Sequence, residues 1–491
     1  MASATGSIPA ARTAPEIARS DMRVIWLLLA AAFVAIFNET TMGIAIPHLN
    51  DDLGLPPELG QWLTSAFMLT MGVVIPTTGF LLQRFTTRQI FISAMVAFTI
   101  GTLVCLVAPG FVTLLAGRVI QAAGTGVMLP LLMTTVMDVV PPQSRGRMMG
   151  RVGMVIALAP AIGPTVAGAV LETMHWRWLF GIVLPIAIVA LAMGTKWMTN
   201  IGETRKVPVD VLSIPLSALG FGGIVFGLSQ FSGEGDAGGS VLLGATSIVV
   251  GVIALAAFAW RQLALQRTGG VLLDLRVLRS GNYSVSVVIV AILSLSMFGT
   301  LTLLPQYLQN VVGLSALQSG LILLPGSVLM GALGPVMGRV YDARGPRTLL
   351  IPGTLMVTAS LFFYATVTEH TEWWVLVLVQ TVMSVGLAMS FTPLFSASLG
   401  SLERPLYSHG SAALSTLQQV AGAAGVAVLM STYSSILHAG ESAGASTAVA
   451  GAPGARTAFL IAAIISIAAV VLSGFVRKPA DDAGEGFHGV H

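Results

Sequence analysis

The sequence predicts an all-α integral membrane protein whose helices cross the bilayer fourteen times. Hydrophobic residues make up 55% of its 491 residues and charged residues only 9%, whereas soluble domains carry about 25% charged residues. Apolar runs of about 20 residues, the length that spans a bilayer, recur along the whole chain. This composition excludes a soluble enzyme, a secreted disulfide-bonded protein and a disordered binding protein.

The expected spans are separated by short segments that hold most of the charged residues. The first span follows a polar leader, residues 1–23, which has no short apolar core with a cleavage site, so we expect a retained helix rather than a signal peptide. In chain order the expected spans are 24–48, 61–82, 90–108, 111–137, 149–171, 177–199, 212–231, 240–260, 284–310, 317–341, 348–367, 372–398, 408–437 and 457–476.

The positions of the basic residues predict the topology. If the leader is cytoplasmic, nearly all of the 24 Lys and Arg residues fall in cytoplasmic segments; Arg177 and Arg456 fall outside, and Arg118 falls within a span. Cytoplasmic loops of membrane proteins carry such an excess of Lys and Arg. We therefore expect an even number of spans with both termini in the cytoplasm. The net charge of +3 reflects this topology and does not indicate a nucleic-acid partner.

Two loops repeat one pattern, a glycine at the end of a span followed by arginines in a tight turn. They lie eight spans apart rather than six, which two parallel six-helix halves with a two-helix insertion would explain. The residues of the pattern are Gly79, Arg84 and Arg88 in the first loop and Gly338, Asp342, Gly345 and Arg347 in the second.

The expected organisation follows from this repeat. A cytoplasmic leader precedes the first six-helix half, a linker and the two inserted helices follow, and a second loop leads into the other half and a cytoplasmic tail. The corresponding ranges are 1–23, 24–199, 200–211, 212–262, 263–283, 284–476 and 477–491.

The fifth expected span carries Gly153, Pro160, Gly163, Pro164 and Gly168. This pattern resembles the antiporter motif of the major facilitator superfamily, in its 14-helix branch of drug:proton antiporters and specifically the lincomycin-resistance type of exporter. The resemblance covers essentially the whole chain. It implies the major facilitator fold, arranged 6+2+6, and export of drugs in exchange for protons.

Other segments carry the same resemblance, and two depart from it. Arg118 and Gln121 in the fourth span and Trp62 in the second are similar to the pattern of this branch. The first loop has Gln83 and Thr86 where the family usually has an acid and a glycine. In the first span the family's acid usually precedes a variable residue and a threonine, whereas here Asn38 stands at that position and the acid is Glu39.

Glu39 and Arg118 are the clear ionisable residues inside the spans. Placing such a group at mid-membrane costs at least about 2.5–3.5 kcal/mol, so each requires a reason. At a rise of about 1.5 Å per residue they lie roughly 13 and 10 Å from the outer ends of their helices, in one layer. We expect Glu39 to carry the proton, with Arg118 close enough to modulate it directly or through water. The alternative is a permanent ion pair that only fixes helix packing.

The fifth span is expected to form a kinked, tightly packed seam. Gly153, Gly163 and Gly168 allow close helix approach, while Pro160 and Pro164 each remove a backbone hydrogen bond. We expect this seam to seal the helix against its counterpart in the other half. The alternative is ordinary small-residue packing.

Candidate drug-binding residues are polar, aromatic or flexible side chains within otherwise apolar spans. A drug pocket is mostly apolar with a few polar groups, and methionine adapts to varied ligands, although most methionines are expected to fill core gaps. The candidates are Asn38, Gln61, Trp62, Gln121, Met128, Met133, Gln306 and Tyr307.

At the cytoplasmic side, Asp138 is expected to pair with Arg84 and Arg88. The sequence contains no nucleotide-binding loop of the P-loop type, so we expect an ion gradient rather than ATP to supply the energy. No cofactor and no metal are expected, because the histidines show no ligand spacing.

The predicted function is proton-coupled export of lipophilic neutral or monocationic small molecules by alternating access. The expected site is a bacterial cytoplasmic membrane, with the lipid bilayer, protons and drugs as partners and a monomeric state. One alternative is a dedicated exporter of a single endogenous metabolite, such as an antibiotic, a lipid or an amino-acid derivative. A channel or a non-transporting sensor is a second alternative, and an intramembrane enzyme a third.

Overall fold

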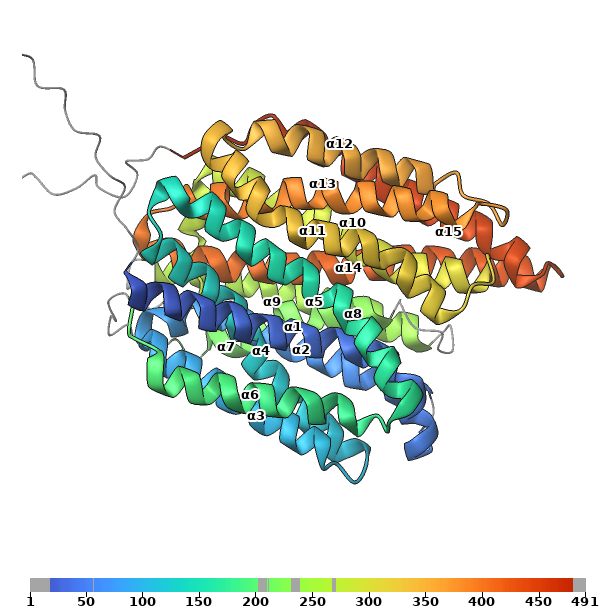
Figure 1. Cartoon of the computed structure of the whole chain (residues 1–491), viewed down its shortest axis with the longest axis horizontal. Helices are drawn as coiled ribbons and strands as arrows, with labels where there is room; N and C mark the ends of the chain where they lie inside the picture. Colours follow the sequence, from blue (N-terminus) through green and yellow to red (C-terminus); the bar gives the residue numbers. More distant parts are fainter. Residues whose placement is uncertain are drawn as a thin grey trace, which may run out of the picture.

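The computed structural model describes residues 18–55, 57–201, 210, 212–230, 239–266 and 271–479. Those residues form helices joined by short loops and include no strand. The helices run roughly side by side, with both ends of the described chain at one end of the assembly (Figure 1). We name the end that holds Arg19 and Ser473 the terminal end, and the opposite one the far end.

Six long helices form the first part of the chain. Helix α3 begins with a capping box, in which Thr86 and Gln89 each accept from the other's backbone N–H. Several helices extend beyond the expected apolar runs, because polar residues continue the backbone hydrogen bonding outside the membrane-length core. The bounds are α1 Arg19–Leu53, α2 Pro57–Arg84, α3 Thr87–Leu106, α4 Phe111–Val139, α5 Arg145–Thr173 and α6 Arg177–Trp197.

An antiparallel hairpin follows. Its first arm consists of α7 (Ser213–Ser217), the π-helical turn η2 (Ala218–Gly222) and α8 (Gly223–Gln230), and its second arm is α9 (Gly239–Leu265). The arms touch through glycines: a Cβ added at Gly227 would lie 2.7 Å from the carbonyl oxygen of Gly244. A larger side chain would therefore separate the two arms.

Six further helices complete the chain. Gly345, in the loop between α11 and α12, has φ +79°, a conformation that favours glycine. At the equivalent position of the first loop, Thr86 is extended at φ −70° and caps α3 instead. The bounds are α10 Gly281–Asn310, α11 Ala316–Arg344, α12 Arg347–Tyr364, α13 Trp373–Gly400, α14 Tyr407–Ser442 and α15 Thr447–Ser473, with short 3₁₀ turns η1 (Pro142–Ser144), η3 (Leu275–Arg279) and η4 (Arg404–Leu406).

Thirteen helices of the described chain are long and apolar enough to cross a bilayer, which makes this a multi-pass membrane protein. The segment expected to span at 212–231 contains a shorter apolar helix, Ser213–Leu228. The π turn interrupts it where a Cβ at Gly220 would meet the backbone of Leu255 on α9 at 3.1 Å.

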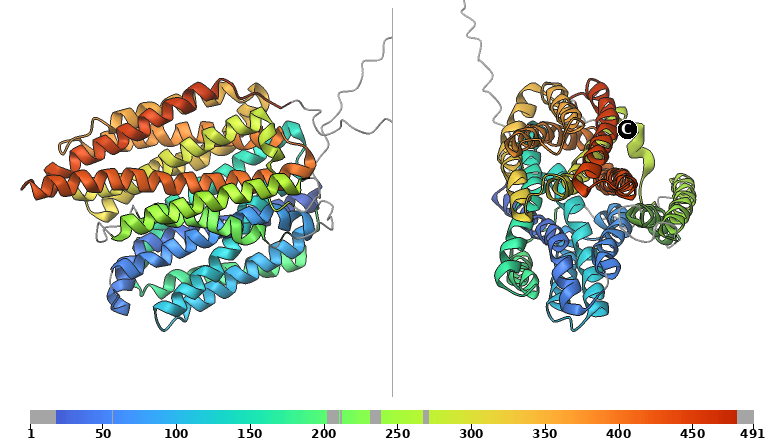
Figure 2. Two further views of the ribbon diagram at one scale, coloured as in Figure 1. Left: turned by 180° about the vertical axis from the view of Figure 1, so that it is seen from behind. Right: turned by 90° about the vertical axis from the view of Figure 1, so that its right-hand side faces the viewer.

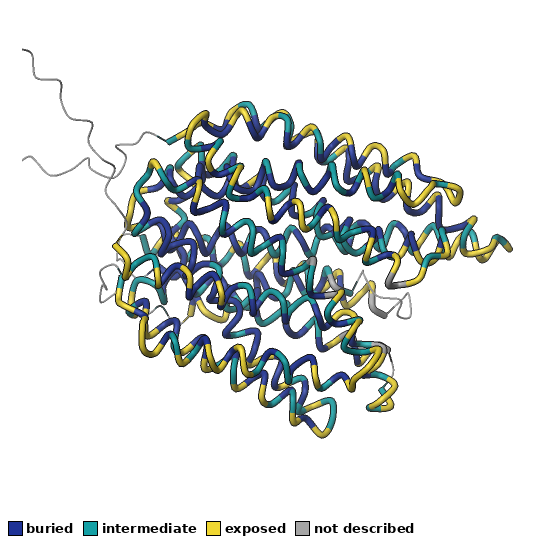
Figure 3. The backbone as a smooth tube through the Cα atoms, in the orientation of Figure 1, coloured by how far each residue is buried: buried dark blue, intermediate teal, exposed yellow. Residues whose placement is uncertain are grey.

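The helices pack as two groups with the hairpin beside them. Helices α1–α6 contact one another, as do α10–α15, and the arm that contains η2 and α8 lies against α2 and α14. The end-on view in Figure 2 shows the two groups next to each other and the hairpin at one side. Buried positions concentrate along the helix faces that point inward, whereas exposed positions follow the outer faces (Figure 3).

Four helix pairs join the groups: α5 packs on α11 and α13, and α14 packs on α2 and α4. The α5–α11 contact is a glycine seam, since a Cβ at Gly150 would lie 2.2 Å from the carbonyl oxygen of Gly334. A Cβ at Gly338 would lie 2.1 Å from the carbonyl oxygen of Gly146. Because these residues occupy the parts of α5 and α11 near the terminal end, the seam closes the assembly there, while the groups diverge toward the far end (Figure 1).

Candidate functional site: a central cavity with one carboxylate

A cavity lies between the two helix groups. Helices α1, α2, α4 and α5 line it from one side and α10, α11, α13 and α14 from the other, each through residues near the middle of its length. We name it the central cavity. Both groups would have to move relative to each other to change access to it.

The lining of the central cavity is mostly apolar with a limited polar set. Five methionines contribute, Met71, Met128, Met297, Met330 and Met383. Among the lining residues, Glu39 is the only one with a charged group. The other polar side chains are Thr40, Thr125, Thr300, Ser327, Gln380, Ser384, Ser415, Gln418 and Gln419, most of them from the second group.

Glu39 reaches the cavity because of its register on α1. The preceding residue, Asn38, is 2% exposed, does not line the cavity, and its side-chain nitrogen has no partner. Successive residues of a helix are rotated by about 100°, so the acid at position 39 faces the cavity whereas position 38 packs inside the first group. Gln419 of α14 also lines the cavity, and its side chain interacts with the Glu39 carboxyl from the other helix group.

Arg118 lies outside the cavity, buried within the first group. Its guanidinium stacks on the ring of Phe67, 4.1 Å from the ring centroid, and donates to the side-chain oxygen of Gln121 at 2.7 Å. Gln121 in turn donates to Thr102 at 2.8 Å. Two guanidinium nitrogens of Arg118 have no hydrogen-bond partner among the described residues. This buried cation therefore has unused hydrogen-bonding capacity.

Glu39 and Arg118 do not form a direct ion pair in this conformation, because their charged atoms are farther apart than the 4.0 Å ion-pair distance. They remain close enough to attract each other electrostatically. Glu39 faces the cavity, whereas the guanidinium of Arg118 lies over the phenyl ring of Phe67 on α2.

The residues of the fifth-span motif do not form one contact surface; each faces a different neighbour. Pro160 lines the central cavity, and a Cβ at Gly163 would lie 2.2 Å from the Thr40 hydroxyl on α1. Gly153 faces Thr392 of α13, and Gly168 has open space around its Cβ position. The side chain of Pro164 lies outside the described part. The expectation that α5 packs against its counterpart in the other half, which would be α14, is wrong: its main partner there is α11, through Gly146 and Gly150.

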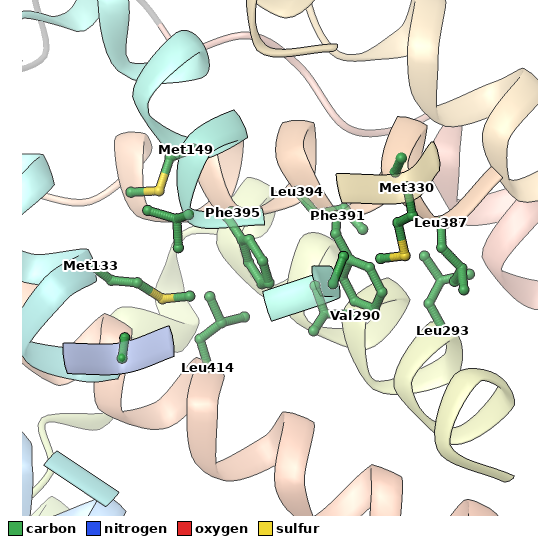
Figure 4. Close-up of a cluster of buried hydrophobic side chains, with 14 of the residues drawn as sticks. Met133, Met149, Val290, Leu293, Met330, Leu387, Phe391, Leu394, Phe395 and Leu414 are labelled. Carbon is green, nitrogen blue, oxygen red and sulfur yellow. The ribbon is translucent and has the colours of Figure 1, made fainter. Parts of the chain in front are cut away.

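The structure brings one expected pocket residue, Met128, into the cavity. Met133 belongs to the apolar cluster shown in Figure 4, together with Met149 and Phe395. Trp62 packs on Phe226 of the hairpin with ring centroids 5.4 Å apart. The side chain of Gln61 lies outside the described part.

Gln306 and Tyr307 lie near the far end of α10. Gln306 is exposed and accepts from Asn310 at 3.1 Å. Tyr307 is fully buried, and its hydroxyl donates to the backbone oxygen of Thr368 at 2.6 Å. Neither residue lines the central cavity.

Sequence reasoning missed the polar residues contributed by α13 and α14. Gln380 and Ser384 are four residues apart on α13, and Gln418 and Gln419 follow Ser415 by three and four residues on α14. Residues with this spacing share one face of a helix. A search for polar residues at helical spacing within apolar spans could have identified them.

The loop motifs join the groups at the terminal end. The Asp342 carboxylate accepts from the backbone amide of Gly146, and Gln83 donates to the backbone oxygen of Pro405 at 3.0 Å. A Cβ at Gly79 would lie 2.7 Å from the ring of His409 on α14. Arg347 donates to the backbone oxygen of Val476 at 3.2 Å.

Asp138 forms no ion pair within the described residues, so its expected pairing with Arg88 is wrong. Arg88 donates instead to the backbone oxygen of Thr195 on α6 at 2.6 Å, because α3 and α6 are neighbours. The positive charges that act on Asp138 are those of Arg404 and Arg145, and Arg404 donates to its backbone oxygen at 3.3 Å. Arg84 lies over the ring of Phe80.

A charged cluster links α1 to the start of α6 at the far end. The Trp176 indole donates to the Asp52 carboxylate at 2.9 Å, and His175 and Arg177 lie 3.3 and 3.6 Å from the same carboxylate. The hydrogen bond from Trp176, with further contributions from His175 and Arg177, lowers the pKa of Asp52.

Comparisons with known proteins give a consistent result. The sequence profile described as Major Facilitator Superfamily matches residues 28–426. The chain is 40% identical over 457 residues to the MFS-type transporter YcnB of Bacillus subtilis, covering 93% of this chain and 95% of that protein. It is 39% identical over 467 residues to the lincomycin resistance protein LmrB of the same organism, covering 93% and 96%.

Among solved structures, the proton:xylose symporter XylE superposes with a TM-score of 0.64 at 15% identity, covering 94% of this chain and 98% of that one. At this low identity the likeness concerns the fold alone.

Proposed function

Because this chain belongs to the major facilitator superfamily, we propose that it is a proton-coupled exporter of lipophilic neutral or monocationic small molecules. It is a membrane transporter and not an enzyme. The proposal rests on one observation: a largely apolar cavity between two helix groups holds a single carboxylate, that of Glu39. Its relative LmrB carries the name of a lincomycin resistance protein, which supports a drug as the cargo.

The proposed arrangement has fourteen membrane-spanning helices in a 6+2+6 order, with Ser213–Leu228 and α9 as the inserted pair. The terminal end faces the cytoplasm of a bacterium. The clustering of Arg84, Arg88, Arg145 and Arg147 at the terminal end supports this orientation, since basic residues favour the cytoplasmic side. In this orientation the seam closes the cytoplasmic side, and the groups diverge toward the outside.

In the proposed cycle, the central cavity holds in turn a proton on Glu39 and a bound drug. A carboxylate in an apolar cavity attracts a proton when the cavity is free of other cations, and a bound monocation or a closer Arg118 favours the ionised form. A rearrangement of α1 against α4 within the first group would bring Arg118 nearer to Glu39 or take it away. The two unpartnered nitrogens of Arg118 are available for that contact.

One coupled proton is energetically sufficient. A proton that returns inward yields about 2.3 kcal/mol per 100 mV of membrane potential, and each 1.4 kcal/mol or so sustains a tenfold gradient of the drug. No nucleotide is required in this scheme.

The test is proton release on drug addition, and pH-driven export in proteoliposomes, for the native chain and for Glu39→Gln. Ethidium, a lipophilic monocation, and lincomycin serve as probes. We expect Glu39→Gln to abolish both signals while the protein keeps its expression level. Retained pH-driven export in Glu39→Gln would contradict the proposal.

A further inference from the structure

The two helix groups use the polar side chains that line the central cavity differently. In the first group, the Thr40 hydroxyl donates to the backbone oxygens of Ile36 and Phe37 at 3.2 and 3.0 Å. The Thr125 hydroxyl donates to the backbone oxygen of Gln121 at 3.0 Å. Both hydroxyls are thus bonded within their own helix. The carboxylate is therefore the polar group that this side of the cavity offers to a cargo.

The second group lines the cavity with polar side chains that keep free hydrogen-bonding capacity. We name five of them the polar wall: Thr300 on α10, Gln380 and Ser384 on α13, and Ser415 and Gln418 on α14. The hydroxyls of Thr300 and Ser415 have no hydrogen-bond partner among the described residues. The side chains of Ser384 and Gln418 make no hydrogen bond to that part of the chain either.

The members of the polar wall are buried, with exposed fractions between 2% and 7%. Other hydroxyls on the same helices donate to a backbone oxygen one turn earlier, as Thr302 does to Phe298 at 3.0 Å and Thr416 to Ala412 at 2.8 Å. A buried hydroxyl without a partner costs free energy. In the wall of a cavity that cost is removed when a cargo, or the water that the cargo displaces, supplies the partner.

Gln380 is held in one orientation by a residue that does not line the cavity. Its side-chain oxygen accepts from the hydroxyl of Tyr364 on α12 at 2.9 Å, which leaves the amide nitrogen to donate to another group. Tyr364 is 0% exposed and packs on the ring of Phe459 on α15, with ring centroids 4.9 Å apart. A donor that is already oriented loses little conformational entropy when it binds a ligand. The polar wall therefore contains a preorganised donor.

The chemistry of the polar wall matches a hydroxyl group better than an aromatic surface. A serine or threonine hydroxyl donates one hydrogen bond and accepts others, and a glutamine amide has both donors and an acceptor. A hydroxyl of a cargo also donates and accepts, so it can bond to any member of the wall. A cargo without such groups would displace water and leave the wall unbonded. A site built to bond a hydroxyl group disfavours an analogue that lacks it for this reason.

We propose that the polar wall binds hydroxyl groups of the cargo and so determines specificity. The preferred cargo is a monocation that carries hydroxyl groups on a part of the molecule separate from its charge. This inference rests on the proposed export function, in which Glu39 on the other side of the cavity pairs with the charge. Such a cargo contacts both helix groups at once. Its binding free energy therefore depends on how the two groups are placed relative to each other.

The test measures the Kd of two monocations for the purified full chain, without a pH gradient. Lincomycin carries one basic amine and several hydroxyl groups, whereas tetraphenylphosphonium carries a permanent charge and no hydrogen-bonding group. Selectivity is the Kd of tetraphenylphosphonium divided by the Kd of lincomycin. We expect Ser384→Ala and Gln418→Leu each to lower the selectivity by about threefold to tenfold, the effect of one lost hydrogen bond to lincomycin.

Two matched variants control for the loss of a polar group elsewhere in the second helix group. Ser396→Ala makes the same substitution on the same helix as Ser384→Ala. The Ser396 hydroxyl is also buried and without a partner among the described residues, but Ser396 does not line the central cavity. Gln306→Leu changes an exposed residue near the far end of α10. Both control variants should keep the native selectivity.

The outcomes separate the polar wall from the function on which it rests. Native selectivity in both Ser384→Ala and Gln418→Leu, or an equal loss of affinity for both probes, would overturn the wall and leave the exporter standing. An effect of Ser396→Ala as large as that of Ser384→Ala would assign the change to packing and also overturn it. Retained pH-driven export in Glu39→Gln would contradict the exporter, whereas the selectivity, measured without a gradient, would still decide the wall. A native chain that binds neither probe would contradict both.

Discussion

The Asp342 carboxylate of α11 accepts a hydrogen bond from the backbone amide of Gly146 at 2.8 Å, across the seam between the two helix groups. The other carboxylate oxygen accepts from the amide of Arg147 at 2.9 Å. Gly146 and Arg147 belong to the first turn of α5, whose amides have no partner within the helix. One side chain therefore caps a helix of the opposite group, and this contact is available only while the seam is closed.

Asp342→Asn should weaken the closed seam. The substitution keeps the shape but removes the negative charge that interacts with the helix N-terminus, which is worth about 1 kcal/mol, or about a fivefold change in population. A reporter cysteine, Ser327→Cys in a Cys105→Ser background, lines the central cavity. Its labelling from the far end by an impermeant maleimide should slow by about that factor. Asp21→Asn, at a half-buried acid in the first turn of α1, is the control, and equal labelling in both variants would contradict the role of Asp342.

The first loop also makes a hydrogen bond between the two helix groups, but with an uncharged side chain. Gln83 occupies the position that Asp342 has in the repeat, and it donates to Pro405 rather than accepting from helix amides. Replacing it with an acid, Gln83→Glu, removes the amide donor and sets a carboxylate against the backbone oxygen of Pro405. We expect a weaker contact and faster reporter labelling from the terminal end, measured with the same Ser327→Cys reporter.

Steric substitution in the seam should stop transport. A Cβ at Gly150 would lie 2.2 Å from the carbonyl oxygen of Gly334, so Gly150→Val forces α5 and α11 apart. Overpacking of this kind costs about 1–3 kcal/mol. We expect loss of pH-driven ethidium export with retained ethidium binding. Gly168→Val, where nothing lies within 4 Å of the Cβ position, is the matched control and should keep export.

The sequence supports an expectation for the depth of the two central ionisable residues, but not for their partners. Counting residues from the expected helix ends predicts that Glu39 and Arg118 lie in one layer, because the helical rise is fixed. Which way each side chain points depends on how the helices rotate within the bundle. Arg118 consequently meets Phe67 and Gln121, and Glu39 meets Gln419, a residue far away in the chain.

Tyr307 and Gln380 illustrate the same limit. Both interrupt apolar spans, although only Tyr307 is among the ligand contacts expected from the sequence. The Tyr307 hydroxyl donates to a backbone oxygen in the loop before α13. The Gln380 side chain accepts from Tyr364 and still lines the cavity. Whether such a residue only makes a structural hydrogen bond or also lines the cavity depends on how distant helices pack around it.

Gln418 should matter for drug binding, and Gln306 should not. Gln418 lines the central cavity, whereas Gln306 is exposed near the far end. Losing a hydrogen bond to a ligand costs about 0.5–1.5 kcal/mol, so Gln418→Leu should raise the Kd of lincomycin roughly threefold to tenfold. Gln306→Leu is the matched control. A larger effect in Gln306→Leu would place the drug outside the central cavity.

Asp52 should make part of the stability dependent on acid pH. Its folded pKa is lowered, chiefly by the hydrogen bond from Trp176, so its stabilising contribution is present above the unfolded pKa of about 3.9 and is lost as pH falls through the folded value. The difference in Tm between the native chain and Asp52→Asn should therefore be constant from neutral pH to about pH 5 and shrink below that. Asp51→Asn, at the neighbouring exposed residue, should not show this change.

The lone carboxylate of the cavity should set the charge of the cargo. Glu39 can balance one positive charge, and the other polar lining groups are neutral amides and hydroxyls. A second positive charge in a mostly apolar cavity would remain unpaired, and an unpaired buried charge is strongly disfavoured. Export of ethidium should therefore exceed that of a dication of similar size, such as propidium, measured as initial rates in the same proteoliposomes. Introducing a second acid by Gln380→Glu should raise propidium export, because the added carboxylate pairs the second charge. Equal rates for both dyes in the native chain would mean that Glu39 does not determine the charge of the drug.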